Sequence, residues 1–397
     1  MENRGKMHTD EADVLKCVGK DICAFWEKRF KEAERNWTGK RPVADAAAKL
    51  VDGSLDVVAE VKRITGGDVK LGDAGMQKPV LLLASTFGVW ASELTLVAGT
   101  LLKAGCQVKI ATEDGSPPHF LSVSMNPDFV DGSWRAPVVS SAEQELAFRF
   151  LNPECAEHAI LKKENIVSLH TLARPPQVGD YLKDKQQFAA YAKVLEDSLH
   201  IARDYSALCI AGGSGAIPGF MFDRGLHSLI LAFHRLGKPI MGECNGALAI
   251  LQTLEPLTEK SILHGRAVTT HSALDEYQSG WGWTVPFEQD TDSFWRDGAF
   301  DLAAYSKAEQ WYSPGTDGNP LIDSEGYFRA AVGCEGRFFS PAGSSYAVAV
   351  DGHFITCRTT PDGYPGALAL IALFNDKDAF SSSPFFIYDD WRGCSIE

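Results

Sequence analysis

The chain lacks several features that mark specialised classes of protein. No stretch approaches the roughly 18 uninterrupted apolar residues of a membrane span. Positive charge is also scarce, because 38 Lys and Arg against 52 Asp and Glu leave a formal net charge of −14. A nucleic-acid binder needs a basic face to neutralise phosphates, so this balance argues against that class. We therefore expect no membrane partner and no nucleic-acid partner.

Cysteine spacing excludes further classes. The nine cysteines are an odd number without the spacing of a disulfide framework, and no Cys-x-x-Cys pair is present to suggest a zinc knuckle or a dithiol centre. The polar start, Met1 to Lys6, lacks the apolar core of a secretory signal. We expect a cytoplasmic, reduced protein without a metal site or cofactor. Its 397 residues, 45% of them hydrophobic, suffice for a large globular core.

The most informative stretch runs from Lys238 to Ile250. An apolar strand pattern leads into Gly242-Glu243-Cys244-Asn245-Gly246, and an apolar helix pattern follows at once. This is the sulfur version of a nucleophile elbow, in which side chains at the flanking glycines would collide with a neighbouring strand or helix. The N-terminal amides of the following helix are expected to lower the pKa of Cys244. The alternative is a small buried core cysteine in a tight turn, and this pattern alone does not decide between them.

The order of patterned segments predicts an α/β fold with a doubly wound, flavodoxin-like parallel sheet. Helices are expected between the strands, and the site lies at the carboxyl edge of the sheet. A final strand at 345–355 and a helix at 366–374 complete the core. The predicted central strands are 79–85, 106–112, 207–211 and 238–243, and the predicted helices are 92–104, 183–204 and 224–236.

Two units are expected along the chain. Residues 1–77 form an N-terminal helical extension, with helices over 9–38 and 43–64. The aromatic stripe of the first helix suits core packing or a contact in a homodimer. Residues 78–397 form the main α/β domain, with insertions near 115–180 and 277–345, the second of which reads as an inserted lid. Trp281, Trp283 and Phe287 either roof the pocket over Cys244 or form the core of this lid.

Strand ends of the predicted sheet carry the partners that a nucleophilic thiol needs. Glu93 begins the helix after the first strand, and His271 follows an expected strand over 265–270. The amides of Gly213 and Ser214, together with that of Asn245, are candidates for an oxyanion hole. Each has a plainer explanation: a charge in a first helical turn, a polar strand-end histidine and a tight turn. Their convergence at one edge favours a site.

These pieces resemble the ThiJ/PfpI superfamily, which includes a protein deglycase and glyoxalase III-type chaperones. The matching segments are 81–105, 210–216, 242–248, 268–271 and 351–358. The resemblance implies that Glu93 hydrogen-bonds the elbow cysteine in a protonated form and that His271 comes from a separate loop. Asn245 and Ser214 stand where the glyoxalase III-type members carry histidine, so that signature is incomplete here. Glutamine amidotransferases share Gly-x-Cys-Asn-Gly, but no His-x-Glu occurs in this chain to complete their triad.

These observations predict a cysteine-dependent hydrolase or hydro-lyase acting on a small carbonyl, amide or nitrile-like metabolite. Cys244 would attack, Glu93 would donate or shuttle a proton, and His271 would act as general acid and base. Arg266 and Arg358 are candidate clamps for a carboxylate substrate. The alternatives are a non-catalytic redox sensor or holdase chaperone that uses an acidic thiol, and an amidotransferase-like glutaminase.

Overall fold

The structure is a computed structural model of the chain. It describes Ala24 and residues 45–67, 78–131, 136–173, 185–271, 283–285, 290–312, 324–340, 346–380 and 384–388. Most of the expected helix over 9–38 lies outside these residues, as do Trp281 and Phe287.

One eight-stranded sheet organises the molecule. Its order is β18-β16-β17-β9-β8-β1-β3-β7, and the pairs from β7 to β17 are all parallel. The run β3-β1-β8-β9-β17 is second-first-third-fourth-fifth in chain order, which is the flavodoxin-like arrangement. The predicted fold class is therefore confirmed. The strands are β1 (Val80–Leu83), β3 (Val108–Thr112), β7 (Val167–Ser168), β8 (Ala207–Ile210), β9 (Ile240–Glu243), β16 (Ala347–Asp351), β17 (Phe354–Cys357) and β18 (Phe385–Tyr388).

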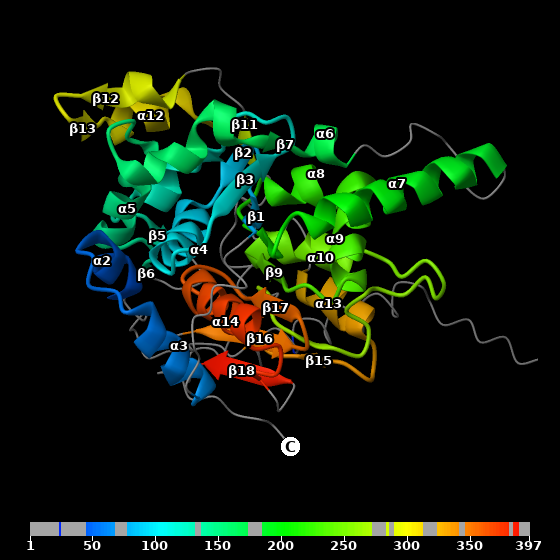
Figure 1. Ribbon diagram of the computed structural model, residues 1–397. Helices are drawn as coiled ribbons and strands as arrows, with labels where there is room; N and C mark the ends of the chain where they lie inside the picture. The colour runs from blue at the N-terminus through cyan, green and yellow to red at the C-terminus, as the bar shows by residue number, and fades with distance from the viewer. Residues whose placement is uncertain are drawn as a thin grey trace, which may run out of the picture.

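Helices cover both faces of this sheet (Figure 1). On one face α4 (Ala91–Lys103) and α14 (Gly363–Asn375) pack with α2 (Asp45–Val51), α3 (Val57–Thr65) and α5 (Ser141–Leu151). On the other face lie α8 (Ala216–Phe220), α9 (Arg224–Arg235), α10 (Ala247–Leu251) and α13 (Ser324–Val332). Because β1, β8 and β9 are buried along their whole length, their residues form continuous apolar runs in place of an alternating pattern.

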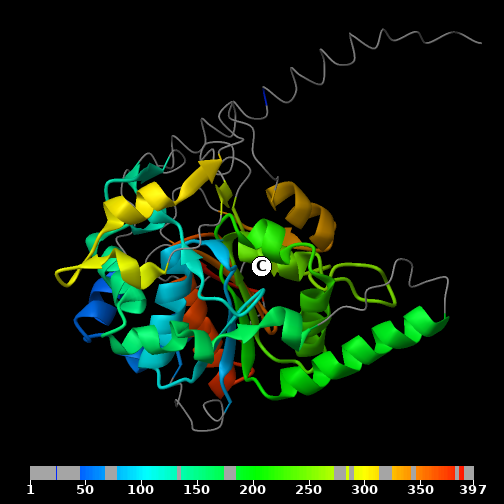
Figure 2. The ribbon, with the colours of Figure 1, turned by 90° about the horizontal axis from the view of Figure 1, so that it is seen from above.

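Local sequence sets the helix boundaries that position the site. The Asp223 carboxylate accepts hydrogen bonds from the first amides of α9, as expected of an N-cap residue. After α4, Gly105 adopts φ 82°, a left-handed conformation that glycine reaches without steric cost. Helix α7 (Lys185–Arg203) packs against α9 at its C-terminal end and extends away from the body of the molecule at its N-terminal end (Figure 2).

Residues 45–67, which belong to the predicted N-terminal extension, pack against α4 and α14. Leu55, Val57, Val61 and Ile64 are buried in the same apolar cluster as α4 and α14. The sequence predicted one helix over 43–64, whereas the structure has two. Residues between α2 and α3 turn at Gly53, which has φ 76°.

Three expectations need correction. The strand predicted over 345–355 is a hairpin of β16 and β17, which turns at Gly352 and His353. The strand predicted over 265–270 shortens to β10 (Ala267–Val268), which pairs with β15 (Arg337–Phe338) outside the main sheet. The predicted final helix begins at Gly363, three residues earlier than expected. A Pro within the first turn of that helix is compatible with helical geometry because the first amides have no acceptor inside the helix.

The two expected insertions consist of short elements. The two insertions contact each other: Trp295 and Phe300 of the second pack against the Phe148 ring on α5, which belongs to the first. The first contains β4 (His119–Phe120), η1 (Ser122–Met125), β5 (Val130–Asp131), β6 (Ala136–Pro137), α5, η2 (Ala156–Leu161), η3 (Lys163–Asn165), β7 and α6 (Leu169–Leu172). The second contains β11 (Trp283–Val285), η5 (Thr291–Phe294), β12 (Trp295–Arg296), β13 (Ala299–Phe300), α12 (Leu302–Ala308), β14 (Gln310–Tyr312), α13 and β15. Strand β2 (Phe87–Val89) pairs with β4.

Within the described residues, no helix combines the length and apolarity required to span a lipid bilayer.

Candidate functional site

Cys244 occupies a strained turn at the carboxyl end of β9. Its φ of 55° lies in the left-handed region, which costs a non-glycine residue of order 1–3 kcal/mol. A Cβ on Gly242 would lie 2.7 Å from the Cα of Ala247, and one on Gly246 would lie 2.6 Å from the carbonyl oxygens of Ile210 and Ala211. Both glycines are therefore required by close packing against α10 and the end of β8, which confirms that the sequence forms an elbow.

The structure brings His271 to the thiol. The Nε2 atom of His271 lies 3.0 Å from the Sγ atom of Cys244, within hydrogen-bonding distance for sulfur. His271 stands directly after Thr270, whose hydroxyl donates to the backbone oxygen of Cys244 at 3.4 Å. The segment after the short strand β10 thus places His271 beside Cys244, although β10 does not belong to the main sheet. A cysteine and an imidazole in contact are the pair that nucleophilic thiol chemistry uses.

Glu93 contacts the same sulfur from the first turn of α4. Its side chain is 1% exposed, and the Cys244 thiol hydrogen-bonds its carboxyl group. Burial raises the pKa of Glu93 to about 8, against the lowering effect of hydrogen bonds from Cys244 and from the amides of Thr360 and Gly212. Glu93 is therefore mainly protonated at neutral pH, and its O–H is available as a donor to sulfur.

The pKa of the Cys244 thiol is raised, whereas the sequence predicted that it would be lowered. Burial raises the pKa of Cys244 well above its usual value, and negative charge on Glu93 raises it further. The amides of Gly213 and Asn245 act in the opposite, expected direction. The sequence pattern revealed the amides but not the depth of burial, which leaves Cys244 only 5% exposed. Forming a thiolate here thus depends on where the proton goes, and His271 is the acceptor within reach.

The two glycine-loop candidates behave differently. Gly213 brings its amide to the sulfur, and its carbonyl oxygen accepts a hydrogen bond from the Asn245 side chain at 3.3 Å. Ser214 is 7% exposed, and its hydroxyl has no hydrogen-bond partner among the described residues. Gly213 and Asn245 therefore gather at the sulfur, whereas the structure gives no contact that ties Ser214 to it.

Sequence reasoning missed the carboxyl groups behind the site. Glu243, the residue before Cys244, is 1% exposed and accepts a hydrogen bond from the amide of Gly363 at 2.8 Å. Asp362 is fully buried beside Arg358, with 3.3 Å between its Oδ2 atom and the Arg358 Nε atom. The adjacency of Glu243 to Cys244 was visible in the sequence, but alternation along β9 does not reveal which charged side chain the helices enclose.

Neither arginine serves as the expected anion clamp. Arg358 is 2% exposed and is paired with Asp362. Arg266 pairs with Asp351 at 2.8 Å and lies over the ring of Phe354. Phe354 begins β17, which runs parallel to β9, so this pair lies at the sheet edge opposite to Cys244. Both guanidinium groups have structural carboxylate partners.

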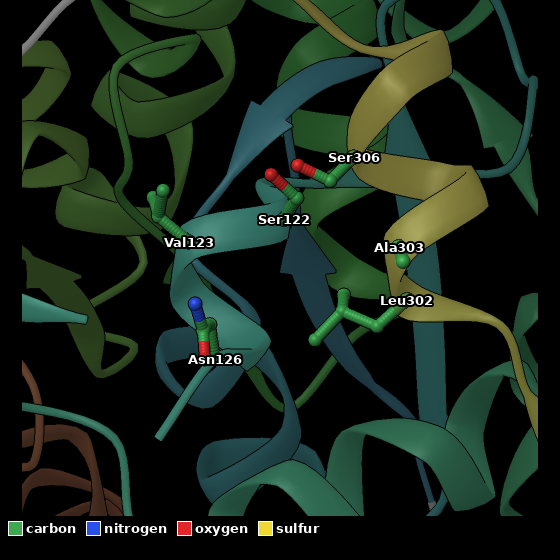
Figure 3. A pocket seen from close by; sticks show the side chains of 6 residues that line it. All are labelled: Ser122, Val123, Asn126, Leu302, Ala303 and Ser306. Carbon is green, nitrogen blue, oxygen red and sulfur yellow. The ribbon is translucent and has the colours of Figure 1, made fainter. Parts of the chain in front are cut away.

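No cluster of three or more metal-ligating side chains occurs among the residues that the structure describes. A cavity of about 350 Å³ lies between η1 and α12 (Figure 3). It is lined by Ser122, Val123, Asn126, Leu302, Ala303 and Ser306. None of the residues that gather at Cys244 lines this cavity, so it is separate from the candidate site.

The chain is similar to known proteins only at low identity. No family model matches the sequence, and no curated protein matches it. Solved structures do match over three quarters of the chain. The rapid encystment protein of 24 kDa from Francisella tularensis is 15% identical, with a TM-score of 0.47. The match covers 75% of this chain and 99% of that chain. A glyoxalase III from Candida albicans is 16% identical, with a TM-score of 0.47 and coverage of 75% and 97%.

A ThiJ/PfpI domain protein from Brachyspira murdochii is 13% identical, with a TM-score of 0.37 and coverage of 75% and 96%. These identities are low, and the likeness concerns the fold. These solved structures are members of the ThiJ/PfpI superfamily.

Proposed function

We propose that the protein is a cysteine-dependent enzyme that acts on a small carbonyl, amide or nitrile-like molecule through Cys244, Glu93 and His271. One observation carries this proposal: the sulfur has an imidazole nitrogen at 3.0 Å, a buried carboxylic acid and two backbone amides around it. A structural cysteine in a turn needs none of these partners. Together they supply the base, the acid and the anion donors that a covalent mechanism requires.

The chemistry follows from these positions. His271 accepts the thiol proton as the sulfur attacks the electrophilic carbon, so an S–C bond forms and the π electrons of the C=O or C≡N bond move to oxygen or nitrogen. The amides of Gly213 and Asn245 already point at the sulfur and are the donors nearest to that developing charge. Protonated His271 then returns its proton to the leaving group, or to the anion itself when no group leaves. Glu93, as a neutral acid, stabilises the sulfur while it is anionic.

The charge around the sulfur favours an uncharged substrate. Among the described residues, the two arginines proposed as clamps are already paired with Asp362 and Asp351. A substrate carboxylate beside the buried Cys244 would therefore be desolvated without a free cation to compensate it, which is costly. We therefore favour aldehydes, neutral amides and nitrile-like groups over acidic metabolites.

The decisive experiment is the alkylation rate of Cys244 against pH, read by peptide mass spectrometry, with and without 2-oxoaldehydes, amides and isonitriles. A C334S variant removes the exposed thiol of Cys334 and serves as the matched control. Protection of Cys244 by one compound class, with turnover that disappears in C244S but not in C334S, supports the enzyme and names its substrate class. Fast oxidation of Cys244 by peroxide without turnover of any compound would instead favour the sensor.

A further inference from the structure

Three carboxyl groups are enclosed behind the nucleophile. Glu93 and Glu243 are each 1% exposed and Asp362 is fully buried. They come from three elements: the first turn of α4, the end of β9 and the loop before α14. Three buried negative charges within electrostatic reach of one another would be prohibitively costly without compensating cations.

Among the residues that the structure describes, a cation contacts only one of these three carboxyl groups, that of Asp362. Arg358 contacts Asp362, whose Oδ1 atom also accepts the Ala347 amide at 3.1 Å and whose Oδ2 atom accepts the Thr359 amide at 3.2 Å. Burial raises the pKa of Asp362 only to about 6, because the guanidinium and these amides favour the charged form. Asp362 is thus the ionised member at neutral pH.

Glu243 has the poorest surroundings for a negative charge. Its Oε1 atom accepts one backbone hydrogen bond, from Gly363, and its Oε2 atom has no hydrogen-bond partner among the described residues. Space around Oε2 is closed, because a Cβ on Gly363 would lie 2.1 Å from it and 2.9 Å from the Cγ2 atom of Val97. An ionised carboxylate with one donor in a closed space without water is far less stable than a carboxylic acid.

The other titratable groups near Glu243 are Glu93 on α4, Asp362 before α14, Cys209 on β8, Cys357 on β17 and Cys244 itself, with Arg358 on the far side of Asp362. Negative charge on Glu93 or Asp362 opposes the ionisation of Glu243. Burial raises the pKa of the thiols of Cys209 and Cys357, so both are neutral. The guanidinium is engaged by Asp362, which leaves the nearby charges predominantly negative.

We propose that Glu243 is a neutral carboxylic acid at neutral pH and a positioning residue for Cys244. The side-chain Oε1 atom of Glu243 accepts the first amide of α14 and so links the end of β9 to this helix, directly after the loop whose Thr360 amide reaches Glu93. Its proton keeps a second negative charge away from the sulfur. The hydrogen bond between Glu243 and Gly363 therefore fixes the positions of Cys244 and Glu93 relative to each other without adding a negative charge that would oppose thiolate formation. Only the statement about thiolate formation rests on the proposed function.

Infrared difference spectroscopy tests the protonation directly. The C=O stretch of a protonated carboxylic acid is resolved from that of a carboxylate, and wild type minus variant isolates one residue. At neutral pH the spectra for E93Q and E243Q should each show the loss of one protonated band. The spectrum for D362N should show loss of a carboxylate without loss of a protonated band, which makes it the control. A carboxylate loss in E243Q would overturn the proposal.

The pH profile of Cys244 alkylation gives the second readout. If Glu243 is neutral, the glutamine of E243Q is equally uncharged and still offers an oxygen to the Gly363 amide, so the pH profile of Cys244 alkylation should match that of wild type. If Glu243 is ionised, removal of a neighbouring negative charge shifts the profile to lower pH by about one unit or more and refutes the proposal. If E243Q does not fold, the infrared spectrum of the E93Q protein decides. A protonated carboxylic acid band that remains without Glu93 and disappears on alkaline titration supports a neutral Glu243. The absence of such a band refutes it. An inert Cys244 beside a confirmed acid at Glu243 would reject the proposed function alone.

Discussion

Replacing Glu93 by Gln should flatten the pH dependence of folding stability. In the folded state burial raises the pKa of Glu93 to about 8 from an ordinary value of 4.5. Because the folded pKa is the higher one, the stabilising effect of the bound proton is complete below about pH 4.5 and is lost as pH rises towards 8. Each pH unit in this window removes about 1.4 kcal/mol, hence of order 5 kcal/mol across it. Glutamine has no proton to release and should lack this contribution.

Urea unfolding at about pH 5, 6, 7 and 8 measures the effect. The free energy of unfolding of wild type should fall more steeply than that of E93Q, by about 1.4 kcal/mol per pH unit. E145Q is the matched control, because Glu145 lies on the surface of α5 with a side chain 56% exposed and should leave the slope unchanged. Equal slopes for wild type and E93Q would show that Glu93 is ionised throughout and would remove the neutral acid from the mechanism.

Two further substitutions test the geometry of the site. In G213A the new Cβ would lie 2.3 Å from the backbone oxygen of Gly88, so we expect a loss of more than about 2 kcal/mol in unfolding free energy and a marked slowing of Cys244 alkylation. The control G53A has a similar positive φ but open space, so a comparable loss there would show that backbone strain alone is responsible. H271A should slow alkylation at neutral pH by about 10² or more, with recovery at alkaline pH; an unchanged profile would exclude His271 as the proton acceptor.

The sequence was most informative where a rule is local. Glycines around Cys244, the buried strands β1, β8 and β9, and the position of Glu93 in a first helical turn all follow from short patterns. Because parallel strands place their carboxyl ends at one edge, the strand order was enough to bring Cys244 and Glu93 together. His271 was also identified, through a motif, although its short strand proved to lie outside the main sheet.

The errors arose where burial and tertiary pairing decide. Helix amides suggested an acidic thiol, but enclosure of Cys244 outweighs them, and enclosure depends on side chains distant in sequence. Arg358 looked like a substrate clamp because the sequence does not show that the loop before α14 brings Asp362, four residues later, against its guanidinium group. Glu243 escaped attention because a charged residue at the end of a strand usually faces water, whereas here α4 and α14 cover it.

The hydrogen bond between the hydroxyl groups of Ser92 and Thr360 joins the start of α4 to the loop before α14 across 268 positions of sequence, with 2.5 Å between the two oxygens. Contacts of such separation form late, because the loop-closure entropy must be overcome before they contribute stability. The thiol of Cys244 acquires its environment only when the two ends of the domain have met. Its reactivity is therefore a reporter of complete assembly: a partly folded chain can hold β1, β3 and α4 in place and still display an ordinary cysteine.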